Sequence, residues 1–295
     1  MYAPHKIPHY ETQYLDILRD VMDNGHISEN KRTGQVTKSV IGRTIVLDVA
    51  NDPYPAITTR KAPIILPIAE KVGYLQGLNN AQDFDDIGSP TWFRNANHSK
   101  AWLENPNRKG ENDLGYVYGV FGRRWVNQFG ETFDQLAKVV NNLKQGIDDR
   151  GEIITYFDPS MHKYGDLRAC MHTHNFALQG DTLYLESYQR SSDLPLGAVA
   201  NIQQVYLFLK LMAHITGKKP GIARLHMTNC HVYEPQFELA YEQLKRKPYF
   251  DVKPQLHIDP SIKTLADIEA LKDMSKFKVT GYDKYHPEIK YPFSD

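Results

Sequence analysis

The feature of the sequence that most limits how this chain can fold is the segment of residues 201–217, which is apolar on almost all of its sides. Its apolar residues follow helical spacing, and a helix without a polar face must be surrounded by other elements. The longest apolar stretch, residues 205–215, is interrupted by Lys210 and His214, and we expect it to be too short to span a bilayer. The segment therefore predicts a central helix in a globular core.

Alternating apolar and polar residues predict strands on both sides of this helix. The alternation runs through residues 170–188 and is interrupted at Gly180-Asp181, which is typical of a two-residue hairpin turn. Residues 45–49 and 223–233 show the same period of two. Because the strands pair as hairpins rather than as regular strand–helix–strand units, we expect an α+β fold.

Helical spacing is found in three further segments: residues 14–22, 133–143 and 237–244. Gly25 lies where the first of these helices should end, and Thr132 is the expected N-cap of the second. Residues 84–110 are rich in Asn, Asp and Pro and are expected to be irregular with short helices. Since no repeat or flexible linker is found, we expect residues 1–295 to form a single domain.

Charge and composition argue against several classes of protein. Lys+Arg and Asp+Glu both number 35, so the formal net charge is zero, which argues against a broad surface for nucleic acid or anionic membrane. Two cysteines cannot form a disulfide scaffold, and the first ten residues lack the apolar core of a signal peptide. We therefore expect a cytoplasmic protein that requires neither nucleic acid nor a membrane.

The sequence contains no phosphate-binding loop of the GxxxxGK[ST] type, no GxGxxG, no HExxH and no paired CxxC. His172 and His174 are two residues apart, so they would share one face of a strand, and this spacing could help to bind a metal. Twelve histidines make such a pair common by chance, and nothing completes a ligand set. We therefore expect no metal site.

Cys170 is the strongest candidate nucleophile. A thiolate is a strong nucleophile, but an isolated cysteine needs a positive neighbour to ionise near neutral pH. Arg168 is near Cys170 in sequence, and a hairpin around Gly180-Asp181 would return Arg190 to its side. An arginine followed by serine at a strand end can also bind a phosphate. These residues leave two alternatives open, an inert buried cysteine and a cysteine beside an anion site.

Ordered motifs along nearly the whole chain resemble the thymidylate synthase family. Around Cys170 they are Tyr188-Gln-Arg-Ser-Ser-Asp193, Leu196-Gly197, Asn201-Ile202 and His231-Val-Tyr233. Upstream and downstream they are Lys31-Arg-Thr-Gly34, Thr58-Thr-Arg-Lys61, Glu70, Leu75-Gln-Gly77, Trp92, Leu114-Gly-Tyr-Val-Tyr-Gly119 and Gly281-Tyr-Asp283. The resemblance implies a large mixed or antiparallel sheet packed with helices, and transfer of a one-carbon unit from 5,10-methylenetetrahydrofolate to C5 of a pyrimidine nucleotide.

The resemblance also implies roles for four catalytic residues. Cys170 would add to C6 of the pyrimidine as a thiolate and make C5 nucleophilic, and Arg190 would favour the ionised thiol. Glu70 would organise water and proton transfer, and its place in an apolar helix is expected to raise its pKa. Tyr118 would position water near the thiol.

By the same resemblance, nine residues would bind the nucleotide: Arg32, Arg150, Gln189, Arg190, Ser191, Ser192, Asn201, His231 and Tyr233. Among them, Asn201 matches an amide that reads the O4 and N3–H edge of uracil, because an amide offers both a donor and an acceptor. His231 and Tyr233 match the pair that binds the 3′-hydroxyl. Three residues would bind the folate: Trp92, Asp193 and Gly197.

The family forms homodimers in which the partner subunit supplies two arginines to the phosphate. This chain has Arg150-Gly151 at that point, so only Arg150 can act in trans. Either the phosphate site is weaker, or Arg168 takes the place of the second arginine.

Several departures from the family pattern bear on the product. They are Met171 after the cysteine, Asn95 in place of a second Trp, Val199-Ala200 before Asn201, Thr228-Asn-Cys-His231, and the C-terminal Pro292-Phe-Ser-Asp295. Tyr156 and Asp158-Pro-Ser-Met161 are similar to a segment of phage deoxycytidylate hydroxymethylases. Because these changes would loosen the packing that excludes water, we expect water capture and 5-hydroxymethyl-dUMP, as used in phage DNA modification.

Asn201 favours dUMP over dCMP, since the deoxycytidylate hydroxymethylases have Asp there. Four alternatives stay open: a thymidylate synthase that makes dTMP and dihydrofolate, a dCMP or CMP hydroxymethylase, a non-catalytic relative that binds nucleotide or RNA, and a zinc enzyme built on His172 and His174.

Overall fold

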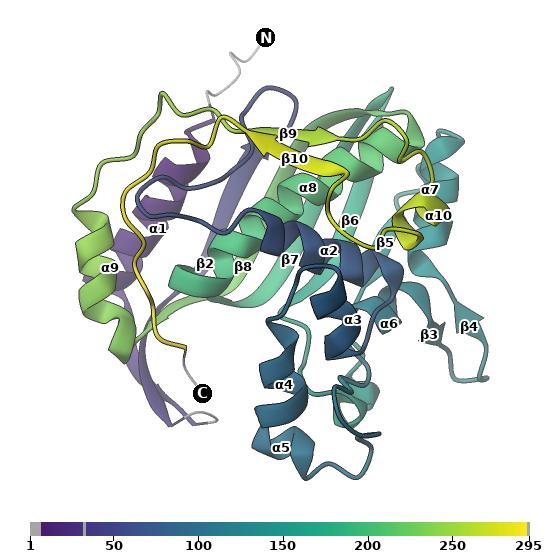
Figure 1. The fold of residues 1–295 in the computed structure, drawn as a ribbon, viewed down its shortest axis with the longest axis horizontal. Coiled ribbons are helices and arrows are strands. Elements are labelled where there is room, and N and C mark those ends of the chain that lie inside the picture. The colour runs from purple at the N-terminus through teal and green to yellow at the C-terminus, as the bar shows by residue number, and fades with distance from the viewer. Residues whose placement is uncertain (1–6, 32–33, 294–295) are drawn as a thin grey trace.

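The computed structural model describes residues 7–31 and 34–293 and confirms the α+β class (Figure 1). A six-stranded sheet has the order β1-β2-β8-β7-β6-β5. Its strands are β1 (His26–Asn30), β2 (Gln35–Asp48), β5 (Ile153–Thr155), β6 (Met171–Gln179), β7 (Thr182–Asp193) and β8 (Lys219–Tyr233). Neighbouring strands pair antiparallel, except that β7 and β8 are parallel, so the sheet is mixed. The predicted hairpin is β6–β7, with Gly180 at a φ of 58° in its turn.

Helices cover one face of this sheet and extend below it in the view of Figure 1. They are α1 (Tyr10–Asn24), α2 (Ile65–Gln76), α3 (Ala81–Asp86), α4 (Trp92–His98), α5 (Lys100–Leu103), α6 (Tyr118–Arg123), α7 (Gln135–Lys144), α8 (Val199–Thr216), α9 (Phe237–Leu244) and α10 (Leu265–Glu269). Shorter turns are η1 (Pro159–Tyr164), η2 (Leu194–Ala198) and η3 (Glu234–Gln236). Two small ribbons pair β3 (Trp125–Val126) with β4 (Thr132–Phe133), and β9 (Gln255–Ile258) with β10 (Phe277–Thr280).

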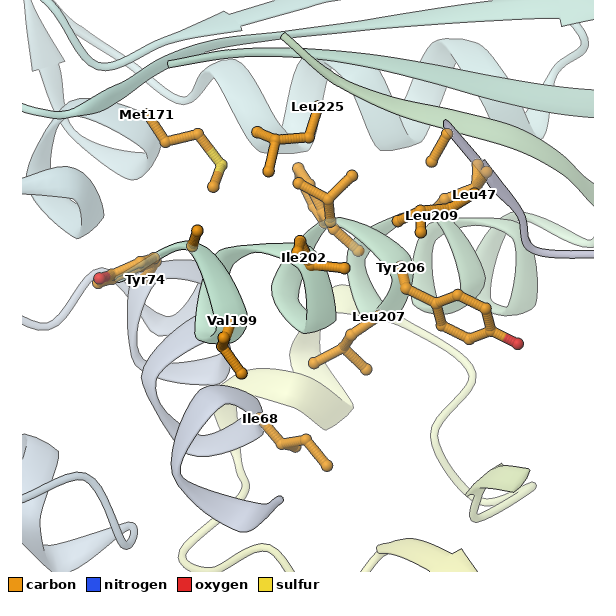
Figure 2. Packing of buried hydrophobic residues seen from close by; sticks show 14 of the residues in the cluster. Leu47, Ile68, Tyr74, Met171, Val199, Ile202, Tyr206, Leu207, Leu209 and Leu225 are labelled. Atoms are coloured by element: carbon orange, nitrogen blue, oxygen red, sulfur yellow. The ribbon is translucent and has the colours of Figure 1, made fainter. Parts of the chain in front are cut away.

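Helix α8 is the central element that the apolar segment predicts. Figure 2 shows it between the sheet, which carries Leu225, and α2, with Leu207 on the side of Ile68 from α2. These side chains are all buried. Because α8 is apolar all round, it can pack against the sheet and α2 at the same time, and this sandwich holds the N-terminal turn of α8 beside the N-terminal end of β6.

The apolar segment is longer than the sequence prediction. Leu194–Thr216, 23 residues, is long and apolar enough to cross a membrane by length and composition alone, so the expectation that it is too short is wrong. The reason is that η2 extends α8 at its N-terminal end with further apolar residues. Because 72% of the most apolar window is buried inside the protein, the segment has the burial of a core helix.

One predicted helix end also differs, and another is confirmed. The second helix, α7, is capped by Asp134, whose carboxylate accepts from the backbone N–H of Ala137 at 2.8 Å, whereas Thr132 belongs to β4. Gly25 ends α1 as predicted, and its backbone is extended. A Cβ at Gly25 would lie 2.2 Å from the carbonyl oxygen of Val21, so close approach, not positive φ, requires glycine there.

Candidate active site

Cys170 lies immediately before β6, at the end of the β6–β7 hairpin opposite its turn. The backbone N–H of Arg190 on β7 donates to the Cys170 carbonyl oxygen at 2.9 Å, and the Arg190 guanidinium lies 3.7 Å from Cys170 Sγ. The same guanidinium donates to the carbonyl oxygens of Arg168 and Ala169 at 2.8 and 3.1 Å, which fixes its position. The predicted proximity of Arg190 and Cys170 is therefore confirmed.

Basic side chains gather around this cysteine. Burial lowers the pKa of His162, and the nearby guanidinium groups of Arg168 and Arg190 lower it further, so the three side chains lie close enough to influence one another. Two exposed guanidinium groups at a strand end can hold a phosphate by paired, charge-assisted hydrogen bonds. This part of the surface is therefore suited to an anionic group of a ligand.

Polar groups of β7 continue the site from Arg190. Gln189 is buried and donates through Nε2 to the carbonyl oxygen of Ser191 at 2.9 Å, while its Oε1 has no hydrogen-bond partner among the described residues. Ser192 Oγ is also buried without a partner in the part of the chain that the structure describes. Buried polar atoms are normally hydrogen-bonded, so these two atoms are candidates to bind a ligand or an ordered water.

A small cavity of about 20 Å³ lies beneath these strand ends. Its lining residues come from α2, α6, α8, β6 and the segment after β5, and they are Lys71, Tyr74, Tyr118, Tyr156, Met171, His174, Asn201 and Gln204. The Tyr118 hydroxyl accepts a hydrogen bond from the backbone N–H of Cys170 at 2.9 Å, which joins the cavity wall to the cysteine. The predicted residues Cys170, Tyr118 and Asn201 are thus brought together.

Glu70 lies half-buried on α2 beside this cavity. Its carboxylate accepts a short hydrogen bond from Nε2 of Gln204, which lines the cavity from α8. Burial raises the pKa of Glu70, and Gln204, Tyr74 and the Lys71 ammonium only partly offset that effect. The direction agrees with the sequence prediction, and it brings the ionisation of Glu70 closer to neutral pH, as general acid–base chemistry requires.

Aromatic rings form the wall around Glu70 and Tyr118. Tyr74 stacks on Tyr118 with ring centroids 4.5 Å apart, and Phe84 stacks on Trp92 at 5.4 Å. Trp92 lies edge-on to Tyr74 at 6.1 Å, and Tyr156 lies edge-on to Tyr118 at 5.5 Å. These packed rings surround the inner part of the site with apolar surface, which limits the access of water.

Asp193 and Gly197 lie at the junction of β7 with η2. The Asp193 carboxylate caps η2 by accepting from the backbone N–H of Leu196 at 3.2 Å, and Gln236 Nε2 lies 3.4 Å from its other oxygen. Burial raises the pKa of Asp193 to about 6. A Cβ built on Gly197 would meet nothing within 4 Å, so the backbone there borders open space. A carboxylate beside open space suits a ligand with N–H donors.

His231 and Tyr233 end β8 on the same side of the site, since His231 is in register with Asp193 of β7. Their rings meet edge-on with centroids 5.0 Å apart, and His231 Nδ1 lies 2.9 Å from Asn229 Oδ1. Burial lowers the pKa of His231 to about 4. The imidazole is therefore neutral near pH 7 and is suited to hydrogen-bond a neutral group such as a hydroxyl.

One predicted nucleotide ligand, Arg150, is not brought to Cys170 of its own chain. Arg150 lies in the turn before β5, next to Asp148, whose carboxylate accepts from the backbone N–H of Leu178 near the far end of β6. Eight strand residues separate Leu178 from Cys170, which is about 26 Å, so Arg150 does not serve the site of its own chain. Arg32 lies outside the described residues.

His172 and His174 do not share a face of β6, so that prediction is wrong. The pairing with β7 shifts between Met171 and Thr173, and such an irregularity changes the alternation of side chains. His174 lines the inner cavity, whereas His172 lines a hollow on the sheet together with Tyr188. Within the described residues, no three metal-binding side chains of the His, Cys, Asp or Glu type are grouped.

Sequence reasoning missed most of the residues that lie on the inner side of the site. They are Lys71, Tyr74, Ser187 and Gln204, together with His174, which the sequence suggested only as a metal ligand. Lys71 itself was a signal in the sequence. Consecutive residues of a helix point in different directions, so when Glu and Lys follow each other in a mostly apolar helix, at least one of them faces the core.

Comparisons with known proteins agree with this arrangement. The family model described as thymidylate synthase matches residues 12–295. A thymidylate synthase of Histophilus somni (strain 2336) is 55% identical over 283 residues, which cover 96% of this chain and 99% of the relative. A thymidylate synthase of Pasteurella multocida (strain Pm70) is 54% identical over 282 residues, covering 95% and 99%, and one of Haemophilus influenzae (strain PittGG) is 53% identical over 283 residues, covering 96% and 99%.

Proposed function

Because the chain belongs to the thymidylate synthase family, whose members use 5,10-methylenetetrahydrofolate as cosubstrate, we propose that it methylates C5 of dUMP and releases dTMP and dihydrofolate. The observation that carries the proposal is the position of Cys170: its sulfur lies 3.7 Å from the Arg190 guanidinium, at a strand end that adjoins a cavity lined by Asn201. A nucleophile, a cation and an amide that reads a base edge are thus supplied by one site.

The first step is the addition of the Cys170 thiolate to C6 of the uracil ring. The Arg190 guanidinium beside the sulfur stabilises the thiolate form and, with Arg168 and Ser191, binds the 5′-phosphate. The new S–C6 bond moves an electron pair into the ring, so that C5 becomes the nucleophile that accepts the one-carbon unit. Binding of the phosphate orients C6 toward the sulfur, which replaces a bimolecular encounter by a positioned one.

Asn201, His231 and Tyr233 select the rest of the nucleotide. The Asn201 amide complements O4 and N3–H of uracil, because it offers one donor and one acceptor on the same plane. Neutral His231, with Tyr233 beside it, hydrogen-bonds the 3′-hydroxyl. Gln189 Oε1 and Ser192 Oγ are buried and lack a partner among the described residues, and we propose that they hydrogen-bond the nucleotide.

Glu70 moves protons at the pyrimidine. C5 must lose its hydrogen after the one-carbon unit is attached, and a carboxylate with a raised pKa is a suitable base near neutral pH. Gln204 holds the carboxylate by a hydrogen bond, and Tyr118 fixes the backbone of Cys170. Glu70 thus acts through water held between α2 and the base.

The folate side is formed by Asp193, Gly197 and Trp92. Methylenetetrahydrofolate supplies the one-carbon unit and the hydride that reduces it. Asp193 fits an N–H-rich pterin ring, because its carboxylate is oriented by Leu196 and adjoins the open space at Gly197. Trp92 is buried beside Glu70, where its indole lowers the pKa of that carboxyl, so the ring contributes an apolar surface next to the group that moves protons.

The choice of methyl over hydroxymethyl rests on the relatives and on the packing of the wall. The relatives that share more than half of their residues with this chain are named thymidylate synthase, and none of those reported above is named a hydroxymethylase. Met171 and Val199, two departures that favoured water capture from sequence alone, are apolar and nearly fully buried. Both therefore support exclusion of water, so that hydride adds to the methylene carbon and the S–C6 bond breaks, with its electron pair returning to Cys170 as the thiolate. Phage DNA modification has no support among these relatives.

The product test is direct. Incubation with dUMP and methylenetetrahydrofolate is expected to yield dTMP and one dihydrofolate per nucleotide, measured by mass spectrometry and by the absorbance change of the folate. A product heavier than dTMP by one oxygen, formed without dihydrofolate, would instead identify the hydroxymethyl reaction. Parallel reactions with dCMP and CMP are expected to give no product, because Asn201 is retained.

We also propose a homodimer in which Arg150 reaches the phosphate of the partner's site. The support is its position: Arg150 is exposed, and about 26 Å of strand separate its neighbourhood from its own Cys170. Mixing inactive Arg150→Glu with inactive Cys170→Ser is expected to restore roughly a quarter of the wild-type rate if subunits exchange randomly, because half of the subunit pairs then contain one complete site. Mixtures that stay inactive despite exchange would contradict the proposal.

We further propose that the protein works in the cytoplasm. Its two cysteines form no disulfide, its formal net charge is zero, and its long apolar helix is largely buried. Fractionation of cells that express the tagged protein is expected to place it in the soluble fraction at low salt. Recovery with membranes would contradict this placement.

A further inference from the structure

Lys71 is a buried lysine that the proposed reaction does not use. Its side chain is 1% exposed and lines the cavity beside Glu70. Its Nζ lies 3.1 Å from Nε2 of His174 and 4.1 Å from the ring centroid of Phe208. Among the described residues, no carboxylate forms an ion pair with it. A buried ammonium without an ion-pair partner is costly, so its presence at this position calls for an explanation.

His174 and Ser187 hold this lysine in place. His174 is fully buried, and its second ring nitrogen, Nδ1, lies 2.8 Å from Oγ of Ser187, which is also fully buried. Burial and the neighbouring Lys71 lower the pKa of His174 well below its usual value, so the ring is neutral and Nε2 can accept from the ammonium. The chain Lys71–His174–Ser187 therefore joins α2 to β6 and β7 under the site.

We propose that Lys71 is a positioning residue for Glu70: its ammonium, oriented by His174 across the cavity, keeps the Glu70 carboxylate ionised and holds a water beside it for proton transfer. This inference rests on the proposed function and adds a residue to it. An ammonium has three donors, and His174 and the face of Phe208 account for only part of them. A cavity of about 20 Å³ with polar lining has room for one such water.

Among the titratable groups around Lys71, Glu70 is the one whose ionisation the charge of Lys71 affects. They are Glu70 and Tyr74 from α2, Tyr118 from α6, Tyr156 after β5, and His174 from β6, whereas α8 contributes Asn201, Gln204 and Phe208, which do not ionise. Burial raises the pKa of each of the three tyrosines, so they stay neutral over the working range. The Lys71 ammonium and the Glu70 carboxylate are therefore the pair of charges that act on each other here.

Lys71 carries its positive charge in the acidic pH range, in which Glu70 would otherwise take up a proton. Burial lowers the pKa of Lys71 to about 7, although the Glu70 carboxylate acts in the opposite direction. Below pH 7 the ammonium is formed and opposes protonation of Glu70, while above pH 8 it is largely neutral and no longer acts on the carboxylate. Loss of Lys71 should therefore be felt on the acid side and not on the alkaline side.

The test compares Lys71→Met with the wild type over pH 5.5–9. Because an adjacent opposite charge shifts a carboxyl pKa by about one unit or more, the acid limb of kcat is expected to move up by about one pH unit, which lowers kcat roughly tenfold at pH 5.5. The two rates are expected to agree within a few fold at pH 9, with KM for dUMP unchanged. Lys210→Met removes a half-buried lysine on another helix, α8, and is the matched control, which should leave the profile in place.

Two further measurements separate this inference from a merely structural role. In a Glu70→Gln background, adding Lys71→Met should cause no further pH shift, because the group on which it acts is gone. A profile of Lys71→Met that runs parallel to that of the wild type at all pH values would overturn the inference, as would an equal loss in the Glu70→Gln background.

Thermal unfolding supplies a readout that does not need activity. A lysine with a folded pKa of about 7 binds fewer protons than in the unfolded chain above that pH, so wild-type stability should rise with pH from 7 toward 10 relative to Lys71→Met. The variant is therefore expected to melt higher than the wild type at pH 6, with a smaller difference at pH 9. If the wild type makes no dTMP, the proposed function fails, and a pH-independent difference in melting would separately contradict the buried ammonium.

Discussion

Replacement of Cys170 by serine is expected to lower the rate of dTMP formation by more than about 10³-fold, because removal of a covalent nucleophile leaves only binding and electrostatic effects. A serine hydroxyl is almost entirely protonated near neutral pH, and the Arg190 guanidinium at 3.7 Å cannot ionise it to a useful extent. The nucleotide should still bind, since its phosphate, base and sugar ligands remain. We would measure product by mass spectrometry and nucleotide binding by calorimetry.

The matched control is Cys230→Ala, which removes the second cysteine of the chain. Cys230 is fully buried on β8, and burial raises the pKa of its thiol to about 12, so it is not a thiolate near neutral pH. This variant is expected to retain the rate within a few fold while losing some stability, because a small cavity replaces the sulfur. If the change of Cys230 abolished activity and the change of Cys170 did not, Cys170 would not be the nucleophile.

Replacement of Glu70 by glutamine should lower kcat by about 10²–10⁴-fold with a much smaller change in KM, which is the usual effect of losing a general acid–base group. Glutamine has the same shape and can still hydrogen-bond Gln204, but it cannot take up a proton. The pKa of Glu70 is raised by burial, so the wild-type rate should fall as pH drops through that raised value. The acid limb should be absent from the residual activity of the variant.

Glu152→Gln is the control for this change, since Glu152 is a fully buried carboxylate outside the site. It accepts from Lys138 and Asn142 of α7 at 3.0 and 2.9 Å. We expect it to lose stability because its ion pair with Lys138 is broken, and to keep the wild-type pH profile. If both glutamine variants lost kcat equally, a general effect on folding would explain the result for Glu70 better than proton transfer.

The architecture was predictable wherever one short-range pattern decides the structure. The apolar segment at residues 201–217 predicted a helix without a polar face, and Gly180-Asp181 between alternating runs predicted a hairpin turn, and both are found. That hairpin in turn places Arg190 beside Cys170, so the core of the site follows from strand pairing alone. The resemblance of motifs to the thymidylate synthase family supplied the remaining elements of the fold.

The parts that could not be predicted depend on tertiary packing. The irregularity between Met171 and Thr173 sends His172 and His174 to different faces, and residue spacing does not encode it. Lys71 is buried because α2 packs against α8 and the aromatic wall at once, a constraint that the periodicity of α2 does not reveal. The departures at Met171 and Val199 suggested looser packing only because their burial was unknown.

The central claim is that Cys170 forms a bond to C6 of the pyrimidine, and 5-fluoro-dUMP tests it most directly. Fluorine at C5 cannot leave as a cation in place of the hydrogen, so the S–C6 bond should persist once the one-carbon unit is attached. Mass spectrometry of the protein incubated with 5-fluoro-dUMP and methylenetetrahydrofolate is expected to show the added mass of both on the peptide that contains Cys170. An unmodified protein under conditions that turn over dUMP, or an adduct on another residue, would contradict the account.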